Sequence, residues 1–177
     1  KGPVNFSYAN IGAVASAEGA VFHGSVDFGN ASVAQNMDFG DTSFLSTTAQ
    51  VTLCGMRVGR NFALQRAVFA GSVCFRETIV GRSLNAQKVR FTNVKEAADF
   101  NHIEVGEDAR FREALFASSA IFSHAVIKGG FDLEEARSTK PLSPITLQNL
   151  TVGRKLSLQG AEFLGEIQLS DAQLSAL

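Results

Sequence analysis

The segment Ala20-Val21-Phe22-His23-Gly24-Ser25-Val26-Asp27-Phe28 contains the pattern that decides the fold of this chain. In it a small or aliphatic residue is followed two positions later by phenylalanine, and after a short interval the same unit begins again. Residues i and i+2 of an extended strand lie on the same face. We therefore expect each unit to be a short strand that directs two apolar side chains into a core.

The pattern repeats along the chain with a period of 47 residues. Three independent columns show this spacing. The first comprises Ala20-Val21-Phe22, Ala67-Val68-Phe69, Ala114-Leu115-Phe116 and Ala161-Glu162-Phe163; the second comprises Ile11-Gly12, Val58-Gly59, Val105-Gly106 and Val152-Gly153; the third comprises Phe28, Phe75, Phe122 and Leu169. An internal repeat of this length is typical of a solenoid, in which each repeat packs only on its neighbours.

Each 47-residue unit divides into two similar turns, a shorter one such as that from Phe22 to Phe44 and a longer one such as that from Phe44 to Phe69. The large inward residues step by five or six, so that each turn holds four of them. Four strands and four corners then close one coil, and coils stack about 4.8 Å apart. The length of 177 residues gives about seven and a half coils and a rod of about 36 Å. The sequence therefore predicts an all-β, four-sided parallel β-solenoid over residues 1–177, either a complete domain or a slice of a longer repeat protein.

The inward positions of this pattern contain almost no polar groups. All 15 phenylalanines occupy them, whereas none of the 16 Lys and Arg residues or the 17 Asp and Glu residues does. Only Thr42, Thr78 and Ser138 are both polar and inward. A slip of one residue would bury charges, so the register of the strands is strongly specified.

One kind of corner has its own residue signature. Glycine follows an inward Ile or Val at Gly12, Gly59, Gly81, Gly106 and Gly153, and two residues after this column come Asn36, Asn61 and Asp108. Gly, Asn and Asp tolerate positive φ better than other residues. We therefore expect left-handed backbone at these positions.

The repeat resembles that of the pentapeptide-repeat proteins, whose consensus is a small residue, a polar residue, Leu or Phe, and two variable residues. The segments that fit are Ala20-Val21-Phe22, Ala31-Ser32-Val33, Ala67-Val68-Phe69, Ala114-Leu115-Phe116 and Ala172-Gln173-Leu174. The chain departs from the family in alternating steps of five and six, and in often lacking Asp or Asn before the central residue. The resemblance implies a right-handed quadrilateral β-helix with Phe or Leu stacked along its axis.

Composition limits the classes of protein to which the chain can belong. Hydrophobic residues make up 45% of it, which argues against disorder. No apolar run approaches the roughly 18 residues of a membrane span, and no signal peptide is visible, so we expect a cytoplasmic protein without a membrane segment. The chain does not begin with Met, so we expect it to have been trimmed or excised from a longer one. The net charge of −1 argues against nucleic acid as a partner.

The two cysteines, Cys54 and Cys74, both occupy outward positions. The shorter turn places Cys74 above Thr52, which leaves Cys54 two positions further along the strand. The resulting diagonal is about 7–8 Å, long for a disulfide. We therefore expect two free thiols.

Three corners are longer than the others: Leu45 to Gln50, Thr92 to Ala97 and Thr139 to Pro144. They are 47 residues apart, so they recur on one edge of the rod in every second coil, about 10 Å apart. Loops on a rigid scaffold often carry binding residues. One interpretation is a ridge that grips an extended partner, and the other is tolerated surface insertions. The candidate partner-binding residues are Thr47, Thr48, Asn93, Lys95, Lys140 and Leu142.

A second candidate is an outward column formed by Glu77, His102, His124 and Asn149 on successive coils. Two imidazoles beside a carboxylate could hold a divalent metal, but a flat column gives poor tetrahedral geometry. The alternative is a solvated polar ladder, and we predict no metal and no cofactor. The chain also lacks a nucleophile, base and acid set and a phosphate-binding glycine motif, so we predict no catalytic residues.

Charges are arranged in two bands. Residues 56–95 contain eight basic and one acidic residue, a net charge of +7, and residues 96–135 contain three basic and nine acidic residues, a net charge of −6. The bands either pair across neighbouring coils, where each pair contributes little, or form a dipole that orients a partner.

Three functions fit these observations. The first is a non-enzymatic scaffold that binds a protein partner of unknown identity; neither end shows a capping helix, so rods that meet end to end as a homodimer are one expected assembly. The second follows from the resemblance, because some pentapeptide-repeat proteins protect DNA gyrase from quinolones by imitating duplex DNA, although mimicry requires a continuous anionic face. The third is a carbohydrate-active enzyme of the β-helix type.

Overall fold

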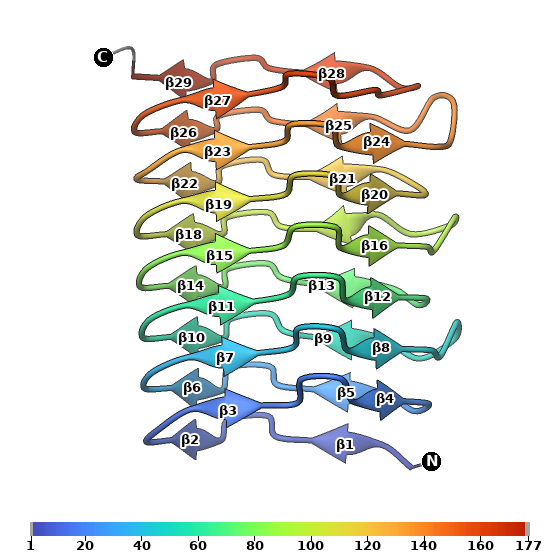
Figure 1. Ribbon diagram of the computed structural model, residues 1–177, viewed down its shortest axis with the longest axis vertical. Helices are drawn as coiled ribbons and strands as arrows, with labels where there is room; N and C mark the ends of the chain where they lie inside the picture. Colours follow the sequence, from blue (N-terminus) through green and yellow to red (C-terminus); the bar gives the residue numbers. More distant parts are fainter. Residues whose placement is uncertain (1, 176–177) are drawn as a thin grey trace.

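The computed structural model describes residues 2–175, so the ends of the predicted domain, at Lys1 and Leu177, lie outside the described residues. It contains 29 strands of two residues each, arranged as four parallel sheets that form the walls of one rod (Figure 1). In Figure 1 the chain crosses the near side from left to right, returns on the far side and rises from the N-terminus at the bottom. This path makes the coil right-handed. The four parallel sheets confirm the predicted four-sided solenoid.

Walls A and B have eight strands each. Wall A comprises β1 (Val4–Asn5), β5 (Val26–Asp27), β9 (Val51–Thr52), β13 (Val73–Cys74), β17 (Ala98–Asp99), β21 (Ala120–Ile121), β25 (Ile145–Thr146) and β28 (Ile167–Gln168). Wall B comprises β2 (Asn10–Ile11), β6 (Ser32–Val33), β10 (Arg57–Val58), β14 (Ile79–Val80), β18 (Glu104–Val105), β22 (Val126–Ile127), β26 (Thr151–Val152) and β29 (Gln173–Leu174).

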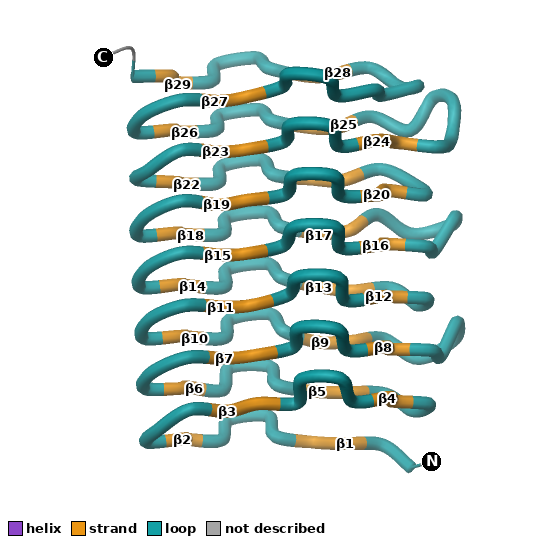
Figure 2. Tube along the Cα trace, in the orientation of Figure 1, coloured by secondary structure: helices purple, strands orange, loops and turns teal. Residues whose placement is uncertain are grey.

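Walls C and D have seven and six strands. Wall C comprises β3 (Ala15–Ser16), β7 (Met37–Asp38), β11 (Phe62–Ala63), β15 (Leu84–Asn85), β19 (Ala109–Arg110), β23 (Phe131–Asp132) and β27 (Leu156–Ser157). Wall D comprises β4 (Val21–Phe22), β8 (Ser43–Phe44), β12 (Val68–Phe69), β16 (Arg90–Phe91), β20 (Leu115–Phe116) and β24 (Arg137–Ser138), and an isolated bridge from Arg137 to Glu162 continues it. Between strands the chain forms short turns (Figure 2). Among the described residues no helix is long and apolar enough to cross a bilayer.

The register of the strands follows the two-coil repeat of the sequence. In wall A, Val4 pairs with Val26, Val26 with Val51, and Val51 with Val73, so that shorter and longer coils alternate along the rod. Each strand turns one residue inward and one outward, and the inward set forms a single continuous core.

The core is organised around phenylalanine stacks that run parallel to the rod axis. Along wall D the rings of Phe44, Phe69, Phe91 and Phe116 lie 4.7, 5.2 and 5.4 Å apart between centroids, with at most 14° between ring planes. A second stack follows wall A, where the centroid of Phe100 lies 4.5 Å from that of Phe75 and 4.7 Å from that of Phe122. The two stacks meet edge to face, as in the contact between Phe75 and Phe91. Offset stacks and edge contacts are the favoured arrangements of aromatic rings.

The three polar residues predicted to point inward are buried and hydrogen-bonded. Thr42 donates its hydroxyl proton to the carbonyl oxygen of Ala17 at 2.8 Å, and Thr78 donates to that of Leu53 at 2.7 Å. The hydroxyl of Ser138 accepts a hydrogen bond from the backbone N–H of Leu164 at 2.9 Å. Each buried hydroxyl thus has a partner, which removes the cost of its burial.

Two of the four corners, A–B and C–D, contain a recurring left-handed residue. At the A–B corner and the C–D corner one residue per coil adopts positive φ; the A–B column is Tyr8, Asn30, Gly55, Glu77, His102, His124, Asn149 and Asp171, and the C–D column is Gly19, Asp41, Arg66, Lys88, Glu113, Glu135 and Gly160. Many of these turns are closed by an Asp or Asn at the end of the preceding strand, as where Asp27 Oδ1 accepts the N–H of Gly29 at 2.7 Å.

The prediction of left-handed backbone at the glycines of the B–C corner is wrong. Positive φ in residues 2–175 occurs at other positions, and the glycines Gly59, Gly81, Gly106 and Gly153 are needed for a different reason. A Cβ on any of these four would lie well under 3.0 Å from a backbone carbonyl oxygen of the coil beneath. Asn36, Asn61 and Asp108 are not left-handed either; their side chains accept backbone N–H groups of the next coil, from Asn61, Ser83 and Gly130.

Candidate functional site

The three long corners all lie at the D–A corner of the rod, where they connect β8 to β9, β16 to β17 and β24 to β25. Figure 1 shows them as the loops that project furthest at the right-hand edge. The intervening coils turn this corner with a short segment, such as Ala70 to Ser72. We call the three long corners together the ridge.

The first two long corners enclose a hollow of about 460 Å³. Thr47 and Thr48 line one side of it, Asn93 and Lys95 line the other, and the short corner at Ala70 and Ser72 lies between them. The hollow is therefore bounded by four of the six residues that the sequence proposed for partner binding.

Several contacts fix the shape of the ridge. The amide of Ala49 donates to the Ser46 hydroxyl at 2.9 Å, and the N–H groups of Lys95 and Glu96 donate to Asn93 Oδ1 at 2.8 and 3.2 Å. Asn93 thus organises its own loop, and its carbonyl oxygen is already engaged. Thr47, Thr48 and Lys95 remain exposed to solvent.

The third long corner contacts the second through Lys140, whose Nζ donates to the carbonyl oxygen of Val94 at 2.9 Å. Leu142 lies at the tip of the third corner with 94% of its surface exposed and a φ of 62°. A bulky residue in left-handed backbone is uncommon and costs free energy. Leu142 also borders a second hollow, of about 300 Å³, together with Pro144, Leu164 and Gln168.

The outward column of Glu77, His102, His124 and Asn149 is present as predicted, on consecutive coils of the A–B corner. The rings of His102 and His124 lie 4.7 Å apart between centroids and are inclined by 6°, so the imidazoles stack face to face. Within residues 2–175, no group of three or more His, Cys, Asp and Glu side chains is arranged to hold a metal ion.

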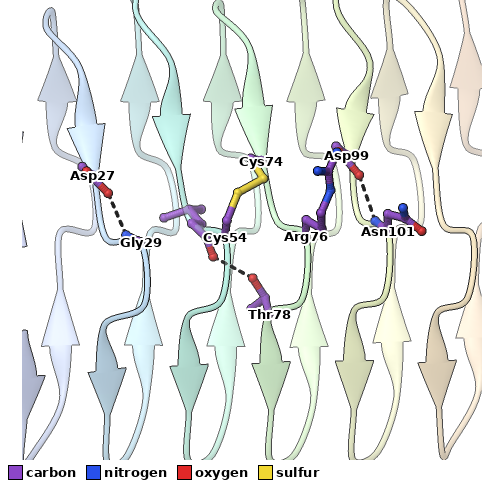
Figure 3. Close-up of a disulfide and its surroundings, with 9 residues drawn as sticks. Asp27, Gly29, Cys54, Cys74, Arg76, Thr78, Asp99 and Asn101 are labelled. Carbon is purple, nitrogen blue, oxygen red and sulfur yellow. Dashed lines mark hydrogen bonds and ion pairs between the residues drawn. A yellow bond between two sulfur atoms is a disulfide. The ribbon is translucent and has the colours of Figure 1, made fainter. Parts of the chain in front are cut away.

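The prediction of two free thiols is wrong, because Cys54 and Cys74 form a disulfide (Figure 3). The register is the predicted one, with Cys74 paired to Thr52. However, β9 ends at Thr52 and the chain turns at Cys54 and Gly55, so the Cα atoms of the two cysteines are only 5.4 Å apart. This separation is within the range that disulfides require. A signal was present in Gly55, which follows Cys54 directly and marks a turn.

The next coil makes the same diagonal connection with charges. Arg76 occupies the position equivalent to Cys54, and its Nη2 donates to Oδ2 of Asp99, which occupies the position equivalent to Cys74, at 2.6 Å. Figure 3 shows the disulfide and this ion pair side by side on the A–B corner. The corner is thus cross-linked through three successive coils.

Other ion pairs run up the C–D corner, and the pair of Lys88 and Glu113 joins the two charge bands. Arg66 donates from Nε and Nη2 of its guanidinium to the two carboxylate oxygens of Asp41, with 2.6 Å between Nε and Oδ1, and Lys88 Nζ lies 3.4 Å from Glu113 Oε2. Further along, Arg112 pairs with Glu135 at 2.9 Å. The hydrogen bond from Arg66 lowers the pKa of Asp41, and the hydrogen bonds to Asp41 and Glu135 raise the pKa values of Arg66 and Arg112.

In comparisons with protein-family models, with curated proteins and with solved structures, nothing matches this chain. Its architecture defines the class to which it belongs, a four-sided parallel β-solenoid in which shorter and longer coils alternate.

Proposed function

We propose that the chain is a non-enzymatic repeat scaffold, a divergent relative of the pentapeptide-repeat proteins, that binds an extended segment of a protein partner along its ridge. The observation that carries this proposal is that all three long corners lie on one edge, where the first two enclose the hollow lined by Thr47, Thr48, Asn93 and Lys95. The four walls and the coil spacing support the placement near the pentapeptide-repeat proteins.

The ridge suits an extended partner because its recognition elements recur along a line. The corners are two coils apart, about 10 Å, which is about three residues of an extended chain. Exposed hydroxyls at Thr47 and Thr48 and the cation of Lys95 offer polar contacts, and Leu142 offers an apolar one. We therefore expect a partner segment that presents acceptor or acidic groups at such intervals, followed by an apolar side chain.

The distribution of ion pairs favours the scaffold over a mimic of duplex DNA. Mimicry needs a continuous anionic surface. Instead, several carboxylates of the acidic band are paired with cations, as at Asp99 with Arg76, Glu113 with Lys88 and Glu135 with Arg112.

Site-specific photo-crosslinking tests the proposal. A photoreactive residue is placed at Thr47, Thr48 or Lys95 on the ridge and, as controls, at Ser16 on wall C or Gln159 at the C–D corner, both of which are exposed. In extract of the source cell we expect the ridge positions to capture the same protein and the controls not to. The Thr48→Arg variant should abolish that capture at position 47, whereas Ser16→Arg should leave it unchanged. Equal capture at ridge and control positions would refute the ridge as the binding surface.

A further inference from the structure

Wall B presents two charged side chains that form no ion pair with any other described residue. Its outward residues, in order along the rod, are Asn10, Ser32, Arg57, Ile79, Glu104, Val126, Thr151 and Gln173. Arg57 and Glu104 are the only charged residues among them, and they lie one coil below and one coil above Ile79. Both are exposed, and neither forms an ion pair with another residue in the part of the chain that the structure describes.

The neighbouring B–C corner has the same order of outer charges, but its central residue is Arg82, and Glu107 accepts a hydrogen bond from the Ser83 hydroxyl at 3.1 Å. Arg60 and Glu107 follow Arg57 and Glu104 by three residues and are exposed. The backbone N–H of Arg82 donates to the carbonyl oxygen of Arg60, and that of Glu107 donates to the carbonyl oxygen of Arg82, both at 3.0 Å. Arg60, Arg82 and Glu107 therefore occupy successive coils, with Arg60 and Glu107 on either side of the coil that contains Ile79.

The surface is thus self-complementary under one particular rotation. A two-fold axis that runs across wall B at Ile79, in the plane of the interface and perpendicular to the rod, reverses the rod direction and keeps each corner on its own side. It places Arg57 opposite Glu104 of a second copy and Arg60 opposite Glu107, and each pair occurs twice. A parallel arrangement would instead place Arg57 opposite Arg57.

From this geometry we propose that wall B binds a second copy of the chain, face to face and antiparallel. The face can be approached closely, because the outward residues that flank the charges are the short Ser32 and Val126. A hollow of about 450 Å³ lies beside Ile79, between Arg57 and Glu104, and Gly55 leaves space at its edge. The aliphatic centre and charged surround resemble the arrangement of a small protein interface.

Two residues oppose this assembly. Arg82 and Glu77 lie in the central coil at opposite corners, and in the proposed dimer each faces its own copy. Exposed ion pairs are individually weak and are screened by salt. We therefore expect a weak dimer whose dissociation constant increases at least tenfold between 50 and 500 mM NaCl. The ridge lies at the D–A corner, diagonally opposite the B–C corner, so partner binding and self-association can be tested separately.

Sedimentation equilibrium with charge-reversed variants tests the proposal. The wild-type chain should dimerise between 10 and 300 µM at low salt. Arg57→Glu with Arg60→Glu, and separately Glu104→Arg with Glu107→Arg, should each weaken the dimer at least tenfold, because each variant carries the same sign of charge at all four facing positions, 57, 60, 104 and 107. Equimolar mixing of the two double variants should restore a dimer, and the quadruple variant should dimerise like the wild type. Thermal unfolding of each variant establishes that it is folded.

The remaining outcomes contradict the proposal. A wild-type chain that stays monomeric at 300 µM and low salt would refute self-association on any face. A dimer that persists in both double variants would lie elsewhere, for example end to end. Double variants that are folded and weakened, but not restored by mixing or by the quadruple reversal, would refute the antiparallel pairing.

Discussion

At the B–C corner, single glycines determine how closely one coil can approach the next. A Cβ placed on Gly59, Gly81, Gly106 or Gly153 would lie 2.2 or 2.3 Å from a carbonyl oxygen of the coil beneath, so no side chain has room there. Gly12 is the first member of the same column, and nothing lies within 4 Å of a Cβ placed on it. Residues at the same position of the repeat therefore differ in what they tolerate.

We expect Gly106→Ala to destabilise the fold by about 1–3 kcal/mol, because the added methyl group forces the backbone of two coils apart. Gly12→Ala is the matched control and should change the free energy of unfolding by less than about 0.5 kcal/mol. Urea denaturation measures both. Equal effects of the two substitutions would mean that the glycines serve the local turn and not the stacking of coils.

The ion pair of Asp41 and Arg66 predicts a specific dependence of stability on pH. The pKa of Asp41 is lowered by the hydrogen bond from Arg66, so the pair stabilises the folded chain above the ordinary carboxyl pKa of about 4 and is lost as the pH falls through the lowered value. Asp41→Asn should therefore reduce the urea midpoint at pH 7 and have little effect at pH 2. Glu96→Gln, a carboxylate without an ion pair among the described residues, is the control. The same loss for Asp41→Asn at both pH values would show that charge is not involved.

At the scale of the element, each strand has only two residues, so no strand is stable alone and each depends on the coil above and below. The disulfide strengthens one such contact, because it ties the turn after β9 to β13 across 20 positions of sequence. A cross-link over a loop of this length restricts the unfolded chain and stabilises the fold by about 3 kcal/mol.

The double variant Cys54→Ser with Cys74→Ser should therefore unfold with about 3 kcal/mol less free energy than the oxidised wild type. Reductant should lower the stability of the wild type to that of the variant and leave the variant unchanged. Two thiols that react in the unreduced wild type would contradict the disulfide.

Disulfides persist mainly in oxidising compartments, so an oxidised pair in protein taken from its source would contradict the predicted cytoplasmic location.

The strands could be predicted from the sequence, whereas the paths of the turns between them could not. Units in which one outward residue stands between two inward residues identify strands such as β12 (Val68–Phe69), because burial has a period of two in a strand. At Gly106 and Cys54 the pattern gives a position along the chain but not the path of the turn. The contact of Gly106 with the coil beneath and the approach of Cys54 to Cys74 both depend on that path. The positions of Thr47 and Lys95 on one edge were predictable, because they depend only on the period of the repeat.

At the scale of the whole molecule, the rod is a stack in which each coil contacts only its neighbours, so complete repeats should be removable. Deletion of residues 85–131 removes one complete two-coil repeat and joins Leu84 to Asp132, which restores an inward residue followed by an outward one in wall C. We expect this shorter chain to fold cooperatively.

Deletion of residues 85–130 is the matched control, since it joins Leu84 to Phe131 and places a phenylalanine in an outward position. The control should lose the cooperative transition that thermal circular dichroism shows for the deletion of the complete repeat. If both deletions unfolded alike, the register of the repeat would not determine the fold.

The central claim is that four flat walls enclose one continuous apolar stack, and a crystal structure tests it most directly. The claim predicts the rings of Phe44, Phe69, Phe91 and Phe116 along wall D, one in each successive coil and about 5 Å apart. Electron density that placed these four rings on different walls, or any of them in solvent, would contradict it.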